Sequence, residues 1–120
     1  MLNGARILVV EDEPLIAMEL AQTIEDMGGV VASARSRQEA LKLAEASAFD
    51  GAILDVRLPD GTGFDVAAYL STIGVPFLFC TADNERHANF SAWPGVAIVP
   101  KPHNSDVIRA ALLVLLKRRG

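Results

Sequence analysis

Five short apolar runs recur along the chain at regular intervals. They occupy residues 6–10, 30–33, 51–55, 75–81 and 96–99. Most of these runs are continuous rather than alternating, and they are rich in β-branched residues. That pattern is typical of strands buried on both faces of a parallel sheet. We therefore predict five strands with helices packed on both sides of the sheet.

Segments with helical spacing lie between the runs. Apolar positions three and four residues apart predict helices over residues 14–27, 37–46 and 63–72. Pro14 suits the first turn of the first helix, and Gly28-Gly29 suits its end. Ser36 and Glu39 resemble a capping box that opens the second helix.

The last two segments differ sharply in apolar content. Residues 83–94 are polar, with few apolar anchors, so we predict a short helix there with few buried contacts. The helix that begins at Asn104 or Ser105 and ends at Lys117 has apolar residues on more than one face. This surplus indicates either a partner surface, such as a homodimer interface, or a helix deeply embedded against its neighbours.

The strand–helix unit is repeated five times. Because crossovers between parallel strands are right-handed, this order predicts an α/β fold, a doubly wound five-stranded parallel sheet in a (βα)5 sandwich. We expect the flavodoxin-like strand order 2-1-3-4-5, which places the first and third strands side by side. Residues 1–120 are expected to form one domain, with no linker and no second domain.

Composition narrows the class of protein further. An apolar content of 51% argues against disorder, and a net charge of -4 argues against a nucleic-acid surface. The basic cluster at residues 117–119 suits the end of a helix. No apolar run is long enough to span a bilayer and no leader pattern opens the chain, so we expect a cytoplasmic protein that binds neither nucleic acid nor membrane. Cys80 lies in an apolar run and is expected to be a small buried residue.

Polar side chains stand where the apolar runs end. Glu11 and Asp12 follow the first run, Asp55 ends the third, Thr81 ends the fourth, and Lys101 follows the fifth. The carboxyl ends of parallel strands meet at one edge of the sheet, where open α/β folds bind their ligands. The sequence thus predicts one crevice whose residue types suit a divalent cation and a phosphoryl group.

Oxygen ligands from several segments are what Mg²⁺ requires. Glu11, Asp12 and Asp55 would supply carboxylates, and the backbone carbonyl of Arg57 would add another oxygen. The alternative for Glu11 and Asp12 is that they only begin the first helix, where acidic residues favour the helix dipole.

The same crevice suits phosphoryl chemistry. A carboxylate such as Asp55 can attack phosphorus and form an aspartyl phosphate. Thr81 would donate its hydroxyl to a phosphoryl oxygen, and Lys101 would contribute a positive charge. A cis bond between Lys101 and Pro102 would turn the lysine toward the crevice.

Four motifs stand at the ends of the predicted strands: Val-Val-Glu-Asp-Glu at 9–13, Leu-Asp-Val-Arg-Leu-Pro-Asp-Gly at 54–61, Thr81-Ala82 and Lys101-Pro102. Together they resemble the response-regulator receiver domain of bacterial two-component phosphorelays. The resemblance covers nearly the whole chain and implies a stand-alone receiver domain, residues 1–120, without an output domain. It implies that Asp55 accepts a phosphoryl group from a sensor histidine kinase or a histidine phosphotransfer protein. It also implies that Glu11, Asp12 and Asp55 hold Mg²⁺, and that Thr81 and Lys101 sense the phosphate.

The chain departs from the usual receiver pattern in two places. Receivers usually carry Tyr or Phe three residues before the lysine, where this chain has Ile98. A signal would then pass through the loop after Thr81 and the 83–94 segment. Arg57 and Asp83 should both border the crevice, and we hypothesise that they pair across it and hinder hydrolytic water. The alternative is two independently solvated side chains.

Three classes of function are compatible with these residues. A receiver would catalyse only its own phosphorylation and dephosphorylation, and would not be an enzyme with a separate substrate. A phosphatase of the haloacid-dehalogenase type also uses an Asp nucleophile and Mg²⁺, but it carries a second Asp where Arg57 stands, and the chain shows no cap domain. Ile98 makes a receiver-like binding module without phosphate turnover possible, whereas the complete set of carboxylates, Thr81 and Lys101 argues against it.

Overall fold

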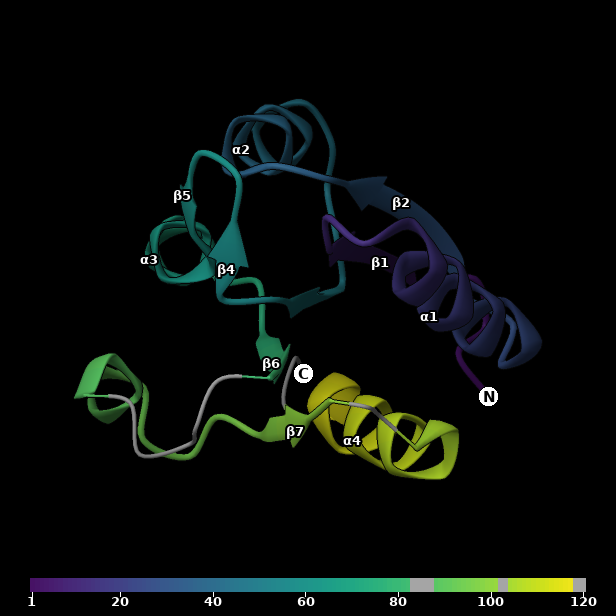
Figure 1. The fold of residues 1–120 in the computed structure, drawn as a ribbon. Coiled ribbons are helices and arrows are strands. Elements are labelled where there is room, and N and C mark those ends of the chain that lie inside the picture. The colour runs from purple at the N-terminus through teal and green to yellow at the C-terminus, as the bar shows by residue number, and fades with distance from the viewer. Residues whose placement is uncertain (83–87, 102–103, 118–120) are drawn as a thin grey trace.

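A computed structural model describes residues 1–82, 88–101 and 104–117 of the chain. Its main sheet has five strands, all parallel, in the order β2-β1-β3-β6-β7 (Figure 1). The strands are β1 (Arg6–Val10), β2 (Val30–Ala34), β3 (Gly51–Leu54), β6 (Phe77–Thr81) and β7 (Ile98–Pro100). This arrangement confirms the predicted order 2-1-3-4-5, with the first and third strands adjacent.

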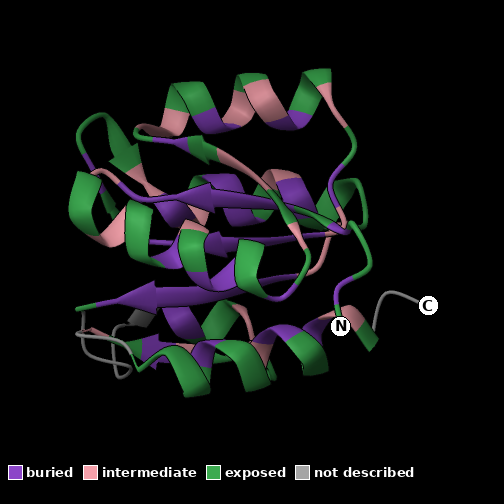
Figure 2. Ribbon diagram, turned by 90° about the vertical axis from the view of Figure 1, so that its right-hand side faces the viewer, coloured by how far each residue is buried: buried purple, intermediate pink, exposed green. Residues whose placement is uncertain are grey.

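Within the described residues, four α-helices cover the two faces of this sheet. They are α1 (Pro14–Asp26), α2 (Arg37–Ala46), α3 (Gly63–Thr72) and α4 (Ser105–Lys117). Helices α2 and α3 pack together on one face, whereas α1 and α4 lie together on the other (Figure 1). Every residue of the central strands β1, β3 and β6 is buried except Arg6, which begins β1 (Figure 2). Among the described residues, no helix combines the length and the apolar character needed to cross a membrane.

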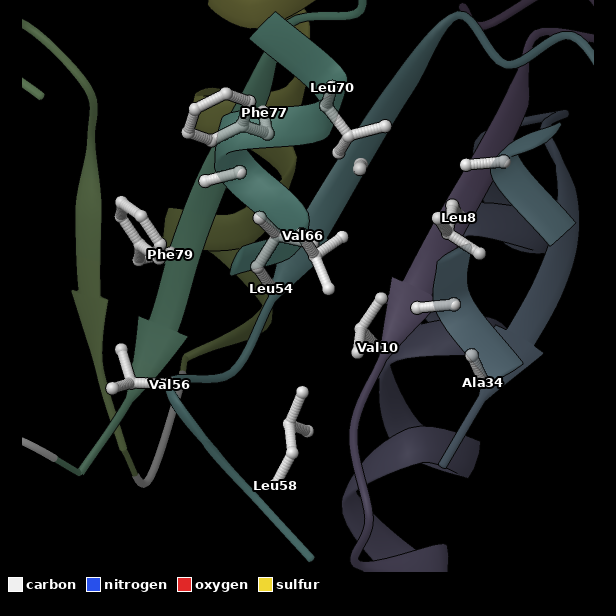
Figure 3. Close-up of a cluster of buried hydrophobic side chains, with 14 of the residues drawn as sticks. Leu8, Val10, Ala34, Leu54, Val56, Leu58, Val66, Leu70, Phe77 and Phe79 are labelled. Atoms are coloured by element: carbon white, nitrogen blue, oxygen red, sulfur yellow. The ribbon is translucent and has the colours of Figure 1, made fainter. Parts of the chain in front are cut away.

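Alternate residues of each central strand enter two separate cores. Leu8 and Val10 of β1 point toward α2 and α3, where they join Leu54 and Phe79 (Figure 3). Ile7 and Val9 enter the opposite core, which also holds the buried residues of α1 and α4. A strand buried on both faces has no polar side, which explains why the apolar runs are continuous.

Local sequence signals set the ends of the first two helices. Pro14 stands in the first turn of α1, and Gly28 follows that helix with a φ of +86°, a conformation that favours glycine. Ser36 Oγ accepts a hydrogen bond from Glu39 N at 3.1 Å, as the predicted capping box requires. The return bond goes to a neighbouring amide, because Glu39 Oε1 accepts from Arg35 N at 2.6 Å.

Two elements differ from the sequence prediction. Residues predicted only as a turn form a small antiparallel hairpin of β4 (Arg57–Leu58) and β5 (Gly61–Thr62). Two-residue strands are too short to produce a periodic pattern. The predicted fifth strand also moves along the chain, from residues 96–99 to Ile98–Pro100.

The segment after β6 is short, as predicted, but better anchored. Its described part contains the 3-10 helix η1 (Ala88–Ala92). The Phe90 ring is buried, with its centroid 5.1 Å from those of both Phe64 and Phe79. Trp93 packs edge-on against Phe77 at 5.3 Å. The polar composition concealed these aromatic contacts, so the expectation of few buried contacts underestimates the packing.

The last helix has the predicted bounds and an uneven distribution of apolar residues. Ile108, Leu112 and Leu115 are buried against the sheet. Val107 and Val114 remain 48% and 53% exposed. The helix is therefore not embedded on every side, and part of its apolar surplus lies at the surface.

Candidate metal centre

Backbone pairing brings the acidic residues together at the carboxyl edge of the sheet. Glu11 N donates to Ala34 O at 2.9 Å, and Asp55 N donates to Val10 O at the same distance. These bonds continue the strand ladders by one residue beyond β1 and β3. As a result, Glu11, Asp12 and Asp55 each offer a carboxylate oxygen, and these oxygens lie within 4.8 Å of one another.

Lys101 follows the edge strand β7, and its side chain reaches the same carboxylates. Its backbone N donates to Thr81 O at 3.0 Å, which fixes the end of β7 beside the end of β6. Its Nζ donates to Asp55 Oδ2 at 2.8 Å and forms an ion pair with Glu11 Oε1. The lysine ammonium therefore points toward these carboxylates. Thr81, the last residue of β6, is buried.

Burial and charge shift the pKa values of two of these groups. Burial raises the pKa of Glu11, and the nearby Asp55 charge adds to this, although hydrogen bonds from Lys101 and Glu13 oppose it. Burial acts against the Lys101 ammonium, but hydrogen bonds and charges from Asp55 and Glu11 outweigh it and raise the lysine pKa. Lys101 is thus held firmly in its charged form.

Cys80 lies close to this cluster on β6 without sharing its chemistry. Burial raises the pKa of its thiol to about 11. The side chain stays protonated near neutral pH and packs in the apolar core, as predicted.

The donor set fits a hard divalent cation. Among the described residues, three carboxylates offer oxygens at this point, and the Lys101 ammonium bonds to two of them. Backbone amides already orient two of the carboxylates: Glu13 N donates to Glu11 Oε2 at 3.0 Å, and Val56 N donates to Asp55 Oδ1 at 2.7 Å. Oxygen ligands held by separate segments are the usual environment of Mg²⁺. Arg57, whose carbonyl is a predicted ligand, begins β4 two residues after Asp55.

The remaining predicted residues have different outcomes. Ile98 pairs with Phe79 across β6 and β7 and packs on the α2–α3 core. Asp83 lies outside the described residues, so its pairing with Arg57 stays a prediction. Pro102 also lies outside them, and so does the proposed cis bond.

Two supporting residues, Asp60 and Gly63, are predicted from the sequence only as parts of a turn and a helix start. Asp60 accepts hydrogen bonds from backbone amides of α2, and Gly63 lies directly against the carbonyl of Asp55. The available signal was the density of Asp and Gly immediately after the candidate nucleophile. These closely spaced Asp and Gly residues indicate a turn, but they do not show which distant segment the turn contacts.

Comparison with known proteins identifies the family. The sequence model of the response regulator receiver domain family matches residues 7–113. The chain therefore belongs to this family of two-component signalling domains. Receiver domains bind Mg²⁺ at an acidic pocket, they interact with histidine kinases or phosphotransfer proteins, and they are not classical enzymes.

Individual relatives agree with this assignment. The chain is 40% identical over 113 residues to the phyllosphere-induced regulator PhyR of Methylorubrum extorquens, covering 91% of this chain and 42% of that protein. It is 34% identical over 119 residues to the transcriptional regulatory protein PdtaR of Mycobacterium tuberculosis, covering 95% and 58% respectively. The chain thus spans about half the length of the curated relatives it matches.

Solved structures share the fold. The response regulator TrrA of Thermotoga maritima, in complex with Mg(2+)-BeF, superposes with a TM-score of 0.83 at 30% identity, covering 93% of this chain and 99% of that one. PhyR of Brucella abortus gives a TM-score of 0.84 at 35% identity, covering 96% and 49%.

Proposed function

We propose that the domain accepts a phosphoryl group on Asp55 from a phosphohistidine of a sensor histidine kinase or a phosphotransfer protein, in the cytoplasm and with Mg²⁺. The observation that carries this proposal is the buried Asp55 carboxylate, bonded to the Lys101 ammonium at 2.8 Å beside two further carboxylates. A lone structural aspartate would not need this surrounding charge.

Each residue of the site has a separate role in the proposed phosphoryl transfer. An oxygen of Asp55 attacks phosphorus, the bond from phosphorus to the donor imidazole breaks, and the imidazole nitrogen takes up the leaving electron pair. Glu11, Asp12, Asp55 and the Arg57 carbonyl would hold Mg²⁺, which supplies charge neutralisation for the phosphoryl oxygens. Lys101 adds a second positive charge, and the Thr81 hydroxyl donates to a phosphoryl oxygen. Water later cleaves the acyl phosphate and restores the carboxylate.

Signal output in this scheme depends on the segment that follows Thr81. Ile98 has no ring to reorient, so we infer that phosphoryl contacts act through the loop after Thr81 and on the 83–94 segment. Phe90 anchors the described end of that segment in the aromatic cluster with Phe64 and Phe79. Movement of the loop would therefore be transmitted to packed side chains and not to solvent alone.

A homodimer through α4 is a second part of the proposal. A groove of about 540 Å³ runs between α4 and β7, and its lining includes Ile98, Val107, Ala110 and Val114. The exposed Val107 and Val114 offer matching apolar surface to a second copy of the chain. Sedimentation equilibrium tests this: a monomer mass at all concentrations would rule it out.

The proposed function is tested by incubating the protein with Mg²⁺ and acetyl phosphate and measuring its intact mass. We expect an adduct of one phosphoryl group in the wild type and none in Asp55→Asn, because the amide cannot form the acyl phosphate. Asp26→Asn, at the opposite end of α1, should retain the adduct. An adduct that persists in Asp55→Asn would refute the assignment. Absence of an adduct from wild type would favour a binding module, and steady turnover of phosphate esters would favour a phosphatase.

A further inference from the structure

The hairpin that follows Asp55 is fastened to the start of α2 by one carboxylate. Asp60 Oδ1 accepts a hydrogen bond from Arg37 N at 2.7 Å, and Asp60 Oδ2 accepts one from Gln38 N at 2.9 Å. These are the first two amides of α2, which have no acceptor within the helix. Ser36 takes the third amide, from Glu39. The helix start is thus satisfied jointly by its own cap and by a residue from a distant segment.

Both segments that Asp60 joins border the metal centre. On one side, the hairpin begins at Arg57 directly after Asp55 and Val56, and Gly63 N donates back to Val56 O at 2.8 Å. On the other side, Arg35, Ser36 and Glu39 line a cavity of about 420 Å³ together with Asp12 and Pro59. The Asp60 bonds therefore fix the distance between two walls of the cavity beside Asp12.

The hairpin has a second anchor in the core. Val56 and Leu58 belong to the same buried cluster as Val10 and Leu54 (Figure 3). The anchors secure different ends: the apolar side chains hold the chain near Asp55, whereas Asp60 holds the tip. The tip also approaches α2 and α3 at Gly61, where a Cβ would lie 2.8 Å from the Arg37 side chain and 3.5 Å from Asp65 Oδ2.

The charge on Asp60 suits this role. Hydrogen bonds from Gln38 N and Arg37 N lower the pKa of its carboxyl, so the group stays ionised at neutral pH. A negative charge at the start of a helix is also favoured by the helix dipole. The neighbouring link between Arg37 Nε and Asp65 Oδ2 is longer, at 3.8 Å, and involves exposed side chains. This ion pair is a useful control for the Asp60 bonds, because it also involves the start of α2 but leaves the amides of that helix untouched.

We propose that Asp60 is a positioning residue for the metal and phosphoryl site. By fastening the hairpin to α2, it sets the conformation of the loop that carries Asp55 and the Arg57 carbonyl before a cation arrives. The proposal rests on the proposed function, because it concerns the same centre. A loop that must be ordered when the cation binds gives weaker binding than one already ordered, and loss of residues that orient metal ligands commonly weakens metal affinity by about 10- to 100-fold.

The test is Mg²⁺ titration by isothermal calorimetry on the whole chain. We expect Asp60→Ala to bind Mg²⁺ at least about tenfold more weakly than wild type. Asp60→Asn keeps one acceptor oxygen, so its Mg²⁺ affinity should lie between those of wild type and Asp60→Ala. Asp65→Asn removes only the longer ion pair and should bind as wild type does. Hydrogen exchange at the Arg37 and Gln38 amides should accelerate in Asp60→Ala, which verifies that the bonds are lost.

The outcomes separate this role from a purely structural cap. Wild-type Mg²⁺ affinity in Asp60→Ala, with fast exchange at Arg37 and Gln38, would overturn the proposal and leave Asp60 as a helix cap. An equal loss of affinity in Asp65→Asn would overturn it as well. If Asp60→Ala does not fold, Asp60→Asn decides, and unchanged affinity there overturns the role. A wild type that binds no Mg²⁺ refutes the proposed function itself, whereas the preceding results refute only the role of Asp60.

Discussion

Replacing Lys101 with methionine is expected to lower the unfolding free energy of the metal-free protein by about 3 kcal/mol. The Lys101 side chain is 12% exposed, and its ammonium bonds to both Glu11 and Asp55. Methionine has a similar length but no charge, so two buried carboxylates would face each other and Asp12 without a cation. Removing one partner of a buried ion pair is costly because the other charge stays desolvated.

The pH window of this effect follows from the raised pKa of Lys101. A lysine whose pKa is higher in the folded state stabilises the protein fully below its ordinary pKa, and this stabilisation is lost as pH rises through the folded value. The measurement therefore belongs at neutral pH, where the contribution is complete.

Urea denaturation measures the change in unfolding free energy, once with a chelator present and once with Mg²⁺ present. Mg²⁺ should recover more stability in Lys101→Met than in wild type, because the cation replaces the missing charge. Lys117→Met, in the exposed last turn of α4, serves as the matched control and should change stability by less than about 0.5 kcal/mol. Equal losses in the two variants, or equal stabilisation of Lys101→Met and wild type by Mg²⁺, would contradict the arrangement of charges described above.

Gly63→Ala is expected to have a comparable effect through packing. A Cβ at Gly63 would lie 1.9 Å from the carbonyl oxygen of Asp55 and 3.0 Å from its carbon. These are backbone atoms of the residue next to β3, so relief requires α3 to move away or Asp55 to shift. We expect a loss of about 2–3 kcal/mol in unfolding free energy and a reduced yield of the phosphoryl adduct under conditions where the variant is folded.

Gly74→Ala separates this contact from a general intolerance of alanine. Gly74 has a φ of +74°, and nothing lies within 4 Å of the position of its Cβ. The substitution costs only the left-handed strain, about 1–2 kcal/mol, and should leave the adduct yield unchanged. If Gly63→Ala formed the adduct as efficiently as Gly74→Ala, Asp55 would not depend on the close contact with Gly63.

The sequence predicted the main sheet because its signals are local and repeated. Apolar runs marked the strands, and turn and cap residues such as Pro14 and Ser36 marked the helix starts. The site residues could be grouped for a related reason: each stands next to the end of a strand, and parallel topology brings those ends to one edge. Asp55 and Lys101 are 46 residues apart in the chain, yet this rule alone places them together.

Contacts that depend on tertiary distances could not be predicted in the same way. The hydrogen bonds from α2 to Asp60 depend on how closely the hairpin approaches the helix, and no local pattern specifies that distance. The packing of Phe90 depends on the position of two other rings. Lys101 was expected near phosphate, but its simultaneous contact with Glu11 and Asp55 follows from side-chain geometry that only coordinates provide.

A crystal structure of the wild-type chain with Mg²⁺ and beryllofluoride, which mimics a phosphoryl group, tests the proposed site most directly. We predict beryllium bound to Asp55, Mg²⁺ held by Glu11, Asp12, Asp55 and the Arg57 carbonyl, and the Lys101 ammonium moved from Asp55 Oδ2 to a fluorine. An ammonium that remained between Glu11 and Asp55, with the cation or the fluoride bound elsewhere, would contradict the proposal that these residues form one phosphoryl-accepting centre.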